Sequence, residues 1–297
     1  MSLDFNPIFI GGEIVKVGYL GPKATFTDIA VRKMFPEYTG VPYLTIPECM
    51  DAVVLGEVDL AVVPLENALE GSVNITLDYL VHEVDLPILG EINVPIRQHF
   101  MVHPDHKDTW KETNRILSHT HAIAQCHKFL HSEFKGVFCE NTTSTAAAAQ
   151  YIQQHPEIKA AAIANDLAAE EYGLTIVKPD IHDISFNHTR FIILAKKTLA
   201  LSEDHPHFHG YKTTIMVTLP ADHPGVLHQV LSAFAWRKLN LSKIESRPMK
   251  TGLGNYFFII DIEMKVDDVL IPGAMQELEA VGCNVTLLGS YPSYNLK

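Results

Sequence analysis

The chain has 297 residues, of which 47% are hydrophobic and 20% charged, and its formal net charge at pH 7 is −12 with all sixteen histidines taken as neutral. This length allows two or three folded units with apolar cores. The negative charge disfavours nucleic acid and anionic membranes as partners, and no apolar run approaches the roughly 18 residues that a membrane-spanning helix needs.

The four cysteines, Cys49, Cys126, Cys139 and Cys283, are scattered along the chain and form no CxxC pair. This spacing predicts neither a zinc site nor a disulfide framework. The chain also shows no charged-then-apolar leader. We therefore expect a cytoplasmic protein with reduced thiols, in which residues 1–13 form an N-terminal tail.

Strands and helices alternate along residues 14–82, which is typical of a parallel α/β sheet. The expected strands are 14–20, 41–44 and 60–63, the last broken by Pro64, and the expected helices are 24–34, 47–55 and 76–82. Two long strands, 86–94 and 98–102, would then cross into a second lobe.

The second lobe repeats this alternation. Its expected strands are 115–117, 136–140 and 159–164, and its expected helices are 118–130, 142–153 and 166–172, the last ended by Gly173. Segments 174–177 and 189–194 would return to the first lobe. The predicted α/β domain thus spans residues 14–200 and has a cleft between its lobes, with lobe 1 at about 14–92 and 176–200 and lobe 2 at about 93–175.

Several predicted strands end in a polar cluster that is followed by a helix. In α/β folds, ligands bind at the carboxyl ends of the strands, where helix N-termini present unpaired N–H groups and positive partial charge. Any one of these hydroxyls is best explained as an N-cap, but their recurrence together with Arg190 favours an anion-binding cleft. The clusters are Thr25 and Thr27; Glu66, Asn67 and Ser72; Ser118; and Thr142–Thr145.

The pattern changes after residue 200. Residues 201–210 lack apolar periodicity and contain Pro and Gly, which predicts a linker. The elements expected beyond it are strand 213–219, a helix that starts at Asp222 and Pro224 and runs to 238, strands 241–248 and 256–264 joined by a turn at 251–255, helix 268–281 and strand 284–288. This β-α-β-β-α-β order is the ferredoxin-like arrangement of an α+β domain, which we assign to residues 211–297.

A hydroxyl and a guanidinium are adjacent at Thr189 and Arg190, where a polar loop meets the apolar run 192–194. Neighbouring residues of a regular strand point to opposite faces, so the two side chains cannot both face one wall of a cleft. Taken alone, the pair is best explained as a strand residue beside a surface cation.

Six motifs in order, however, resemble those of the prephenate dehydratase family. They are GYLGPKATFT at 18–27, VVPLENALEGSVN at 62–74, SHTHAIAQC at 118–126, NTTSTAAAA at 141–149, AAIANDLAAEEYGL at 161–174 and NHTRF at 187–191. The C-terminal part resembles the ACT regulatory domain of that enzyme, through 224–227 and 244–248, and the whole resemblance covers about residues 14–291. Two departures are Ala68, where the family often has a hydroxyl residue, and Thr120, where it often has proline.

The resemblance implies a lyase that converts prephenate to phenylpyruvate, CO2 and water without a metal or redox cofactor. It implies that Thr189 donates a proton or a hydrogen bond to the leaving hydroxyl. Because a threonine hydroxyl is a weak acid, we favour a hydrogen bond that strengthens as charge develops on that oxygen. Arg190 would hold a substrate carboxylate or brace the site. The other substrate-binding residues that we expect are Phe191, Asn187, Glu66, Asn67, Ser118, Gln125, Thr143, Ser144 and Thr25.

The resemblance also implies that two ACT domains pair and bind L-phenylalanine, a feedback inhibitor, at their interface. Binding there would favour one arrangement of a homodimer, or of a dimer of dimers built through ACT and catalytic domains, and so lower activity in the cleft. The residues expected at this site are Pro224, Gly225, Val226, Leu227, Glu245, Ser246, Arg247 and Pro248.

Two other functions stay open. Arogenate dehydratase acts on a substrate that differs only by an amino group in place of the keto oxygen. A non-catalytic small-molecule sensor would suit a two-lobed architecture that resembles periplasmic solute-binding proteins. Other patterns are weaker: His127 and His131 have helical i, i+4 spacing but no partner cluster for a metal. The alternating histidines of the linker, His205, His207 and His209, are expected to bind nothing specific.

Overall fold

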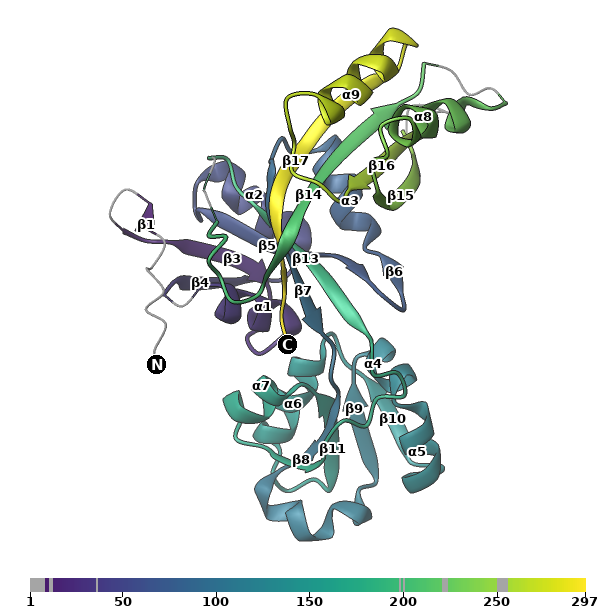
Figure 1. Cartoon of the computed structure of the whole chain (residues 1–297). Helices are drawn as coiled ribbons and strands as arrows, with labels where there is room; N and C mark the ends of the chain where they lie inside the picture. The colour runs from purple at the N-terminus through teal and green to yellow at the C-terminus, as the bar shows by residue number, and fades with distance from the viewer. Residues whose placement is uncertain are drawn as a thin grey trace. The chain divides into compact units, whose positions relative to one another are not determined.

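The computed structural model describes residues 9–10, 13–35, 37–197, 199, 201–220, 224–249 and 256–297 (Figure 1). The chain forms two compact units: unit 1 holds residues up to 84, 92–192 and 296–297, and unit 2 holds residues 85–91 and 193–295. Across the described residues, every helix is too short or too polar to cross a bilayer. The predicted helix start at Asp222 and the predicted turn at 251–255 lie outside the described residues.

The first lobe of unit 1 contains a parallel sheet with helices between its strands. In this sheet β3 (Lys16–Leu20) pairs in parallel with β4 (Thr39–Tyr43) and with β5 (Leu60–Asn67). The elements around it are α1 (Phe26–Met34), α2 (Ile46–Leu55), β6 (Gly71–Ser72), α3 (Asn74–His82) and the short antiparallel pair β1 (Phe9–Ile10) and β2 (Glu13–Ile14).

Local sequence explains where these helices begin and end. Thr25 caps α1 by accepting a hydrogen bond from the Asp28 N–H, and Thr45 and Glu48 form a complete capping box at the start of α2. Gly56 ends α2 with a φ of +76°, the left-handed conformation that glycine adopts without a steric penalty.

The predicted break of β5 at Pro64 is wrong, because the strand continues to Asn67. Pairing of β5 with β3 ends at Val62, and pairing with β6 begins at Glu66. Pro64 lies between these two registers, where its missing N–H interrupts neither ladder, and its carbonyl accepts a hydrogen bond from the Thr76 hydroxyl (2.6 Å). The polar residues that follow are therefore held on a strand.

The second lobe of unit 1 is built on a five-stranded sheet in the order β10-β9-β11-β8-β12. Strand β9 is parallel to β10 and β11, and β8 is antiparallel to β11 and β12. The strands are β8 (His99–Val102), β9 (Arg115–Ser118), β10 (Phe138–Asn141), β11 (Ala160–Ala164) and β12 (Thr175–Lys178). The helices are the 3₁₀ segment η1 (Pro104–Glu112), α4 (Thr120–Gln125), α5 (His127–Glu133), α6 (Thr145–Gln154) and α7 (Asp166–Glu171).

Two predictions for this lobe are wrong. Segment 174–177 does not return to the first lobe, because β12 pairs with β8 and completes the second sheet. The single helix predicted over 118–130 is two helices, since Cys126 leaves helical geometry with φ −115° and ψ 22°. Segment 189–194, the other segment predicted to return, belongs to β13 (His188–Leu194). This strand lies beside β5 of the first lobe.

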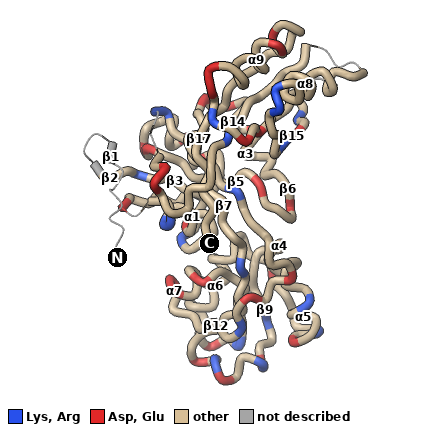
Figure 2. Tube along the Cα trace, viewed as in Figure 1, with Lys and Arg blue, Asp and Glu red and all other residues tan. Residues whose placement is uncertain are grey.

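The two lobes contact each other at the start of α1. Ala24 is fully buried within the apolar cluster of the second lobe, and its carbonyl accepts a hydrogen bond from the side-chain amide of Asn165 (2.9 Å). The acidic end of α7, red in Figure 2, contributes Glu171, which pairs with Arg32 of α1 at 3.0 Å. Asn165 also caps α7 through Oδ1 (2.8 Å to the Ala168 N), so one side chain serves both lobes.

Unit 2 contains the predicted ferredoxin-like arrangement. Its strands follow the order β15-β16-β14-β17, and every registered pair among them is antiparallel. The elements are β14 (Phe208–Thr218), α8 (Val226–Ala235), β15 (Leu241–Pro248), β16 (Tyr256–Ile262), α9 (Leu270–Ala280) and β17 (Asn284–Asn295). Strands β7 (Ile88–Pro95) and β13 each carry the chain from one unit into the other.

The first and last strands of this arrangement in chain order, β14 and β17, are longer than predicted. β14 pairs with β17 from Phe208 onward, so residues 208–210 of the predicted linker are strand. The strand predicted over 284–288 ends too early, because Gly289 interrupts the apolar pattern, whereas β17 continues to Asn295. That glycine lies where an added Cβ would overlap the carbonyl oxygen of Ile88. Within the predicted linker, His205 is 8% exposed and its ring packs against Tyr294 (centroids 5.2 Å apart).

We predict that Asn165→Ala lowers the free energy of unfolding by about 1–3 kcal/mol, since it removes an N-cap and leaves the buried Ala24 carbonyl without its donor. Asn165→Ser keeps a cap acceptor but removes the side-chain amide that donates to Ala24, and should therefore lose part of this amount. Urea unfolding of the full chain measures both. Equal stability of Asn165→Ser and the wild type would contradict a role for the contact with Ala24.

Candidate functional site

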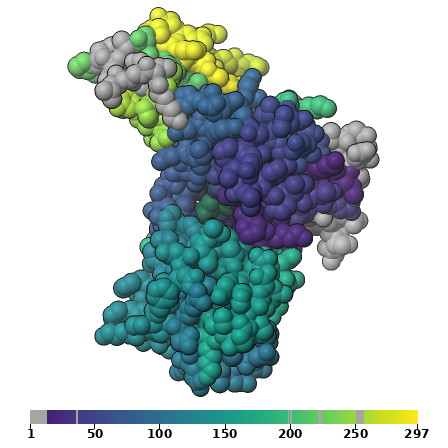
Figure 3. Space-filling view, turned by 180° about the vertical axis from the view of Figure 1, so that it is seen from behind, coloured from purple at the N-terminus to yellow at the C-terminus, as the bar shows by residue number. Residues whose placement is uncertain are grey.

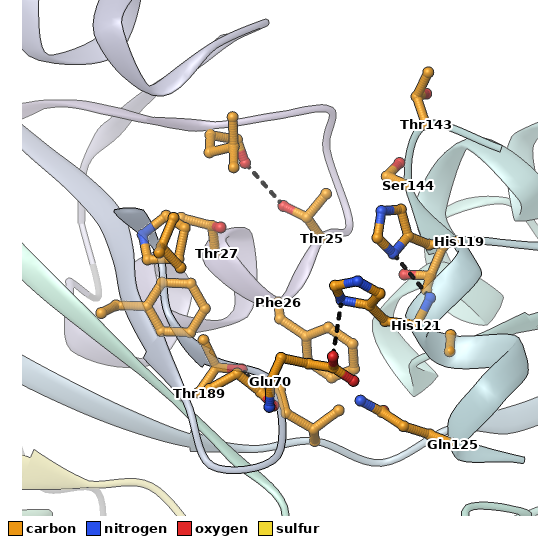
Figure 4. Close-up of a pocket in the computed structure, with 18 of the residues that line it drawn as sticks. Thr25, Phe26, Thr27, Glu70, His119, His121, Gln125, Thr143, Ser144 and Thr189 are labelled. Atoms are coloured by element: carbon orange, nitrogen blue, oxygen red, sulfur yellow. Dashed lines mark hydrogen bonds and ion pairs between the residues drawn. The ribbon is translucent and has the colours of Figure 1, made fainter. Parts of the chain in front are cut away.

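A pocket of about 740 Å³ lies between the two lobes of unit 1. Figure 3 shows the purple and blue first lobe above the teal second lobe, with a hollow where they meet. The first lobe contributes the loop before α1, the β5–β6 turn and β13, and the second lobe contributes the starts of α4 and α6 (Figure 4). The polar residues of the lining are Thr25, Thr27, Asn67, Glu70, Ser72, Gln98, His119, His121, Gln125, Thr143, Ser144, Thr145 and Thr189.

Four helices of the described chain begin at this pocket. Its lining includes the N-cap residue of each: Thr25 of α1, Val73 of α3, His119 of α4 and Ser144 of α6. Helix N-termini carry positive partial charge and unpaired N–H groups. No lysine or arginine is among the described lining residues. The pocket therefore attracts anions through backbone dipoles rather than through a fixed cation.

Strand β13 follows the two-residue alternation expected of a regular strand. Thr189 and Phe191 line the pocket, whereas Arg190, between them, is buried at 7% exposure on the other face. The Arg190 guanidinium lies 3.6 Å from the Glu66 carboxylate. This placement favours the predicted bracing role of Arg190 over direct contact with a ligand.

Asn67 connects Thr189 to the turn between β5 and β6. Its amide nitrogen donates to the Thr189 hydroxyl oxygen (2.8 Å), and its Oδ1 accepts from the N–H groups of Leu69 and Glu70 (3.0 and 3.1 Å). Because the Thr189 oxygen already accepts this hydrogen bond, its own proton is directed elsewhere. Thr189 can thus act as a hydrogen-bond donor to a ligand in the pocket.

The structure brings together some of the predicted substrate-binding residues and not others. Ser118 is fully buried and donates to the Ile163 carbonyl (2.6 Å). Asn187 is 2% exposed, and its backbone carbonyl accepts from the Ile96 N–H (2.9 Å). Ser118 and Asn187 therefore do not line the pocket, and neither do Glu66 and Arg190. The predicted residues that line the pocket are Thr25, Asn67, Gln125, Thr143, Ser144, Thr189 and Phe191.

The sequence analysis missed three titratable residues of the pocket: Glu70, His119 and His121. His119 caps α4, with its Nδ1 accepting from the His121 N–H (3.4 Å). A histidine directly after the buried Ser118, at a helix start, is the signal that could have found it. Glu70 comes from the first lobe and lies 3.9 Å from His121 of the second lobe (Figure 4).

The environment of His119 favours its neutral form. Burial lowers the pKa of His119, the neighbouring His121 lowers it further, and Glu70 opposes this shift. The hydrogen bond at Nδ1 places the proton of the neutral ring on Nε2. The ring of His121 lies edge-on to it, with centroids 5.0 Å apart. Among the described residues, no group of three or more His, Cys, Asp or Glu side chains is placed to hold a metal ion.

Unit 2 has a second pocket, of about 350 Å³, at the start of α8. Of the residues predicted there, Pro224, Glu245, Arg247 and Pro248 do not line it. Strand alternation accounts for Glu245 and Arg247, which flank Ser246 on β15 and point to the opposite face; Glu245 pairs there with Lys243 at 3.1 Å. The lining consists of Leu219, Gly225, Val226, Leu227, Ser246, Tyr256 and Phe258.

Comparison with known proteins agrees with this architecture. The family model described as prephenate dehydratase matches residues 17–199, and that described as ACT domain matches residues 213–283. A prephenate dehydratase of Bacillus subtilis (strain 168) is 61% identical over 95% of this chain and 100% of its own length.

Solved structures give the same result for the fold. A prephenate dehydratase from Arthrobacter aurescens, in complex with L-Phe, is 36% identical with a TM-score of 0.81 over 93% of this chain and 90% of its own. A structure described as GqqA, a novel type of quorum quenching acylase, also has a TM-score of 0.81, at 27% identity over 94% of this chain and 98% of its own. The architecture is thus similar in proteins described by different activities.

We predict that acidification destabilises the fold in part through His119. Since the pKa of His119 is lowered in the folded state, the unfolded chain takes up the proton first. The stability that neutral His119 contributes is therefore fully present when the pH is above the ordinary pKa of imidazoles. It is lost as the pH falls below that value and through the lowered pKa of the folded state. His119→Asn keeps a capping acceptor without titrating.

In urea unfolding at about pH 7.5 and about pH 5, His119→Asn should lose less stability than the wild type. His127→Asn, on the exposed face of α5, is the matched control and should behave as the wild type does. Identical losses in all three proteins would contradict the prediction.

Proposed function

Because the chain belongs to the prephenate dehydratase family, we propose that it acts as a carbon–oxygen lyase that converts prephenate to phenylpyruvate, CO2 and water. The observation that carries this proposal is the Asn67–Thr189 hydrogen bond at the wall of an anion-attracting pocket. It leaves the threonine proton available to a hydroxyl group of the substrate.

The substrate chemistry suits this pocket. Prephenate carries two carboxylates and a hydroxyl group on a cyclohexadiene ring. The N-termini of α1, α3 and α6 would hold one carboxylate by their N–H groups. The rings of Phe26 and Phe191, which also line the pocket, offer an apolar surface to the substrate ring.

The reaction balances with a single proton. The bond between the ring and its carboxylate breaks and releases CO2, and the electron pair moves into the ring as the C–O bond breaks. The departing hydroxide takes up one proton, supplied by solvent, and leaves as water, and the ring becomes aromatic. In our proposal the Thr189 hydroxyl donates a hydrogen bond to this departing oxygen as its negative charge develops. The step as written transfers no electrons to or from an acceptor.

The second pocket supports a regulatory role for unit 2. We propose that L-phenylalanine binds at the start of α8, where Gly225 has a φ of +89° and an exposed helix N-terminus. Leu227 and Tyr256, which are 40% and 42% exposed, would contact the aromatic ring. The proposal includes pairing of two ACT domains around this site, as a homodimer or a dimer of dimers, and inhibition of the cleft. The proposal also includes a cytoplasmic location, and it is supported by the four cysteines, all of which are free thiols.

Arogenate is the rival substrate, since it differs only where prephenate has its keto oxygen. Parallel assays with both compounds separate the two: the proposal expects the higher kcat/KM with prephenate. A protein that binds prephenate and turns over neither compound would be a sensor, and that outcome would overturn the proposed activity.

We predict that Thr189→Val, which keeps the shape of the side chain but removes its hydroxyl, lowers kcat for phenylpyruvate formation by about 100-fold or more. Thr189→Ser keeps the hydroxyl and should stay within about tenfold of the wild type. Asn67→Asp keeps the acceptor for the β5–β6 turn. Its carboxylate would accept a hydrogen bond from the Thr189 hydroxyl instead of donating one to it, so kcat should fall about 10- to 100-fold. Turnover by Thr189→Val close to that of the wild type would leave the family assignment intact and reject the mechanism.

We predict that Leu227→Ala weakens inhibition by L-phenylalanine about tenfold, because it removes about 1.5 kcal/mol or more of apolar contact from the second pocket. The readout is the L-phenylalanine concentration that halves the rate of phenylpyruvate formation. Leu287→Ala is the matched control, since Leu287 is a 44% exposed leucine of the same unit outside the pocket lining. Equal inhibition of both variants would argue against this site.

A further inference from the structure

The charge balance of the catalytic pocket depends on few side chains. Of the described lining residues, Glu70 is the one carboxylate and His119 and His121 are the imidazoles. As noted above, lysine and arginine are missing from the described lining. A dianionic substrate must therefore enter beside the negative charge of Glu70.

Glu70 is held in this position by the same residue that orients Thr189. The Asn67 Oδ1 accepts the Glu70 N–H (3.1 Å), while the Asn67 amide donates to Thr189 (2.8 Å). The backbone of Glu70 is thereby fixed on a turn at the pocket wall, and its side chain is 38% exposed. Its repulsion of a substrate carboxylate is reduced by solvent but not removed.

The two histidines differ in their ability to offset this charge. His119 uses Nδ1 as the acceptor of a backbone N–H, so a second proton on its ring would face another donor. His121 has no such constraint: its Nδ1 faces the Glu70 carboxylate at 3.9 Å, and its side chain is 55% exposed. The pair is an ion pair only when His121 is protonated. The titratable groups that face His121 in the described structure are Glu70, from the β5–β6 turn, and His119, from its own helix.

We propose that His121 is a specificity-determining residue which, when protonated, offsets the charge of Glu70 and so allows this pocket to accept a dicarboxylate. The inference rests on the proposed function and names a charge requirement within it. Neutral His121 leaves a net charge of −1 on the pair, and protonated His121 leaves none. Substrate affinity should therefore be higher with protonated than with neutral His121.

Four variants test this charge balance: His121→Gln, Glu70→Gln, the double variant with both changes, and His127→Gln as a matched control outside the pocket. KM and kcat for prephenate are measured from about pH 6 to about pH 8.5 at low ionic strength. At about pH 6, His121→Gln should raise KM about three- to tenfold with kcat within about twofold. Its KM should not change with pH, whereas the KM of the wild type and of His127→Gln should rise towards that value.

The double variant decides between two roles of His121. With both charges removed, the net charge of the pair is zero, so KM should return to within about twofold of the wild-type value at about pH 6. Glu70→Gln alone should give an equal or lower KM. High salt should reduce the differences, because the side chains involved are partly exposed.

Each contrary result has a defined meaning. A KM of the double variant as high as that of His121→Gln would show direct contact with substrate and overturn the charge-offset role. A KM of His121→Gln that matches the wild type at every pH would overturn the inference while leaving the proposed function intact. Failure of the wild type to form phenylpyruvate would instead overturn the proposed function, and this inference with it.

Discussion

Two adjacent cross-strand pairs between β5 and β13 determine what this pocket can do. On one face, Glu66 of β5 lies against Arg190 of β13, and on the other, Asn67 donates to Thr189. Because side chains alternate along a strand, the Glu66–Arg190 pair and the pocket pair cannot exchange places without a shift of register. The burial of Arg190 beside Glu66 thus favours the register that presents the threonine hydroxyl to a ligand. The turn that carries Glu70 depends on the same Asn67 side chain.

The sequence was sufficient to predict the order of elements, because hydrophobic periodicity and capping residues are local signals. The residues of this strand pair were predicted through the family resemblance, and their pairing with one another was not predicted. Prediction from the sequence failed where long-range pairing decided the outcome. Pro64 predicts the end of a strand only if the neighbouring strands are unknown. Between the β3–β5 and β5–β6 pairings, its missing N–H interrupts neither ladder. Segment 174–177 has a strand pattern, but the pattern does not say that its partner is β8. Likewise, the motif that contains Ser118 indicated the correct side of the pocket. Ser118 itself is buried, however, and the next residue, His119, lines the pocket.

The global charge of the chain is a poor guide to this site. A net charge of −12 acts over distances at which salt screens it strongly, since the Debye length is about 8 Å at physiological ionic strength. Helix N-termini act at contact distance and are fixed by the fold. A negatively charged protein can therefore bind an anion where α1, α3 and α6 begin, and the charge of one nearby carboxylate matters more there than the sum over the surface.

The insertion of the second lobe into the first has a consequence for synthesis of the chain. β5 and β13 are neighbours in the sheet, but the residues that they bring together, Asn67 and Thr189, are separated by 122 positions. The first lobe cannot complete its sheet until β13 has left the ribosome. The second lobe is continuous in sequence, and the Ala24 that completes its core is made before it, so it can fold during translation. The threonine on which the chemistry depends is thus among the last parts of unit 1 to find its partner.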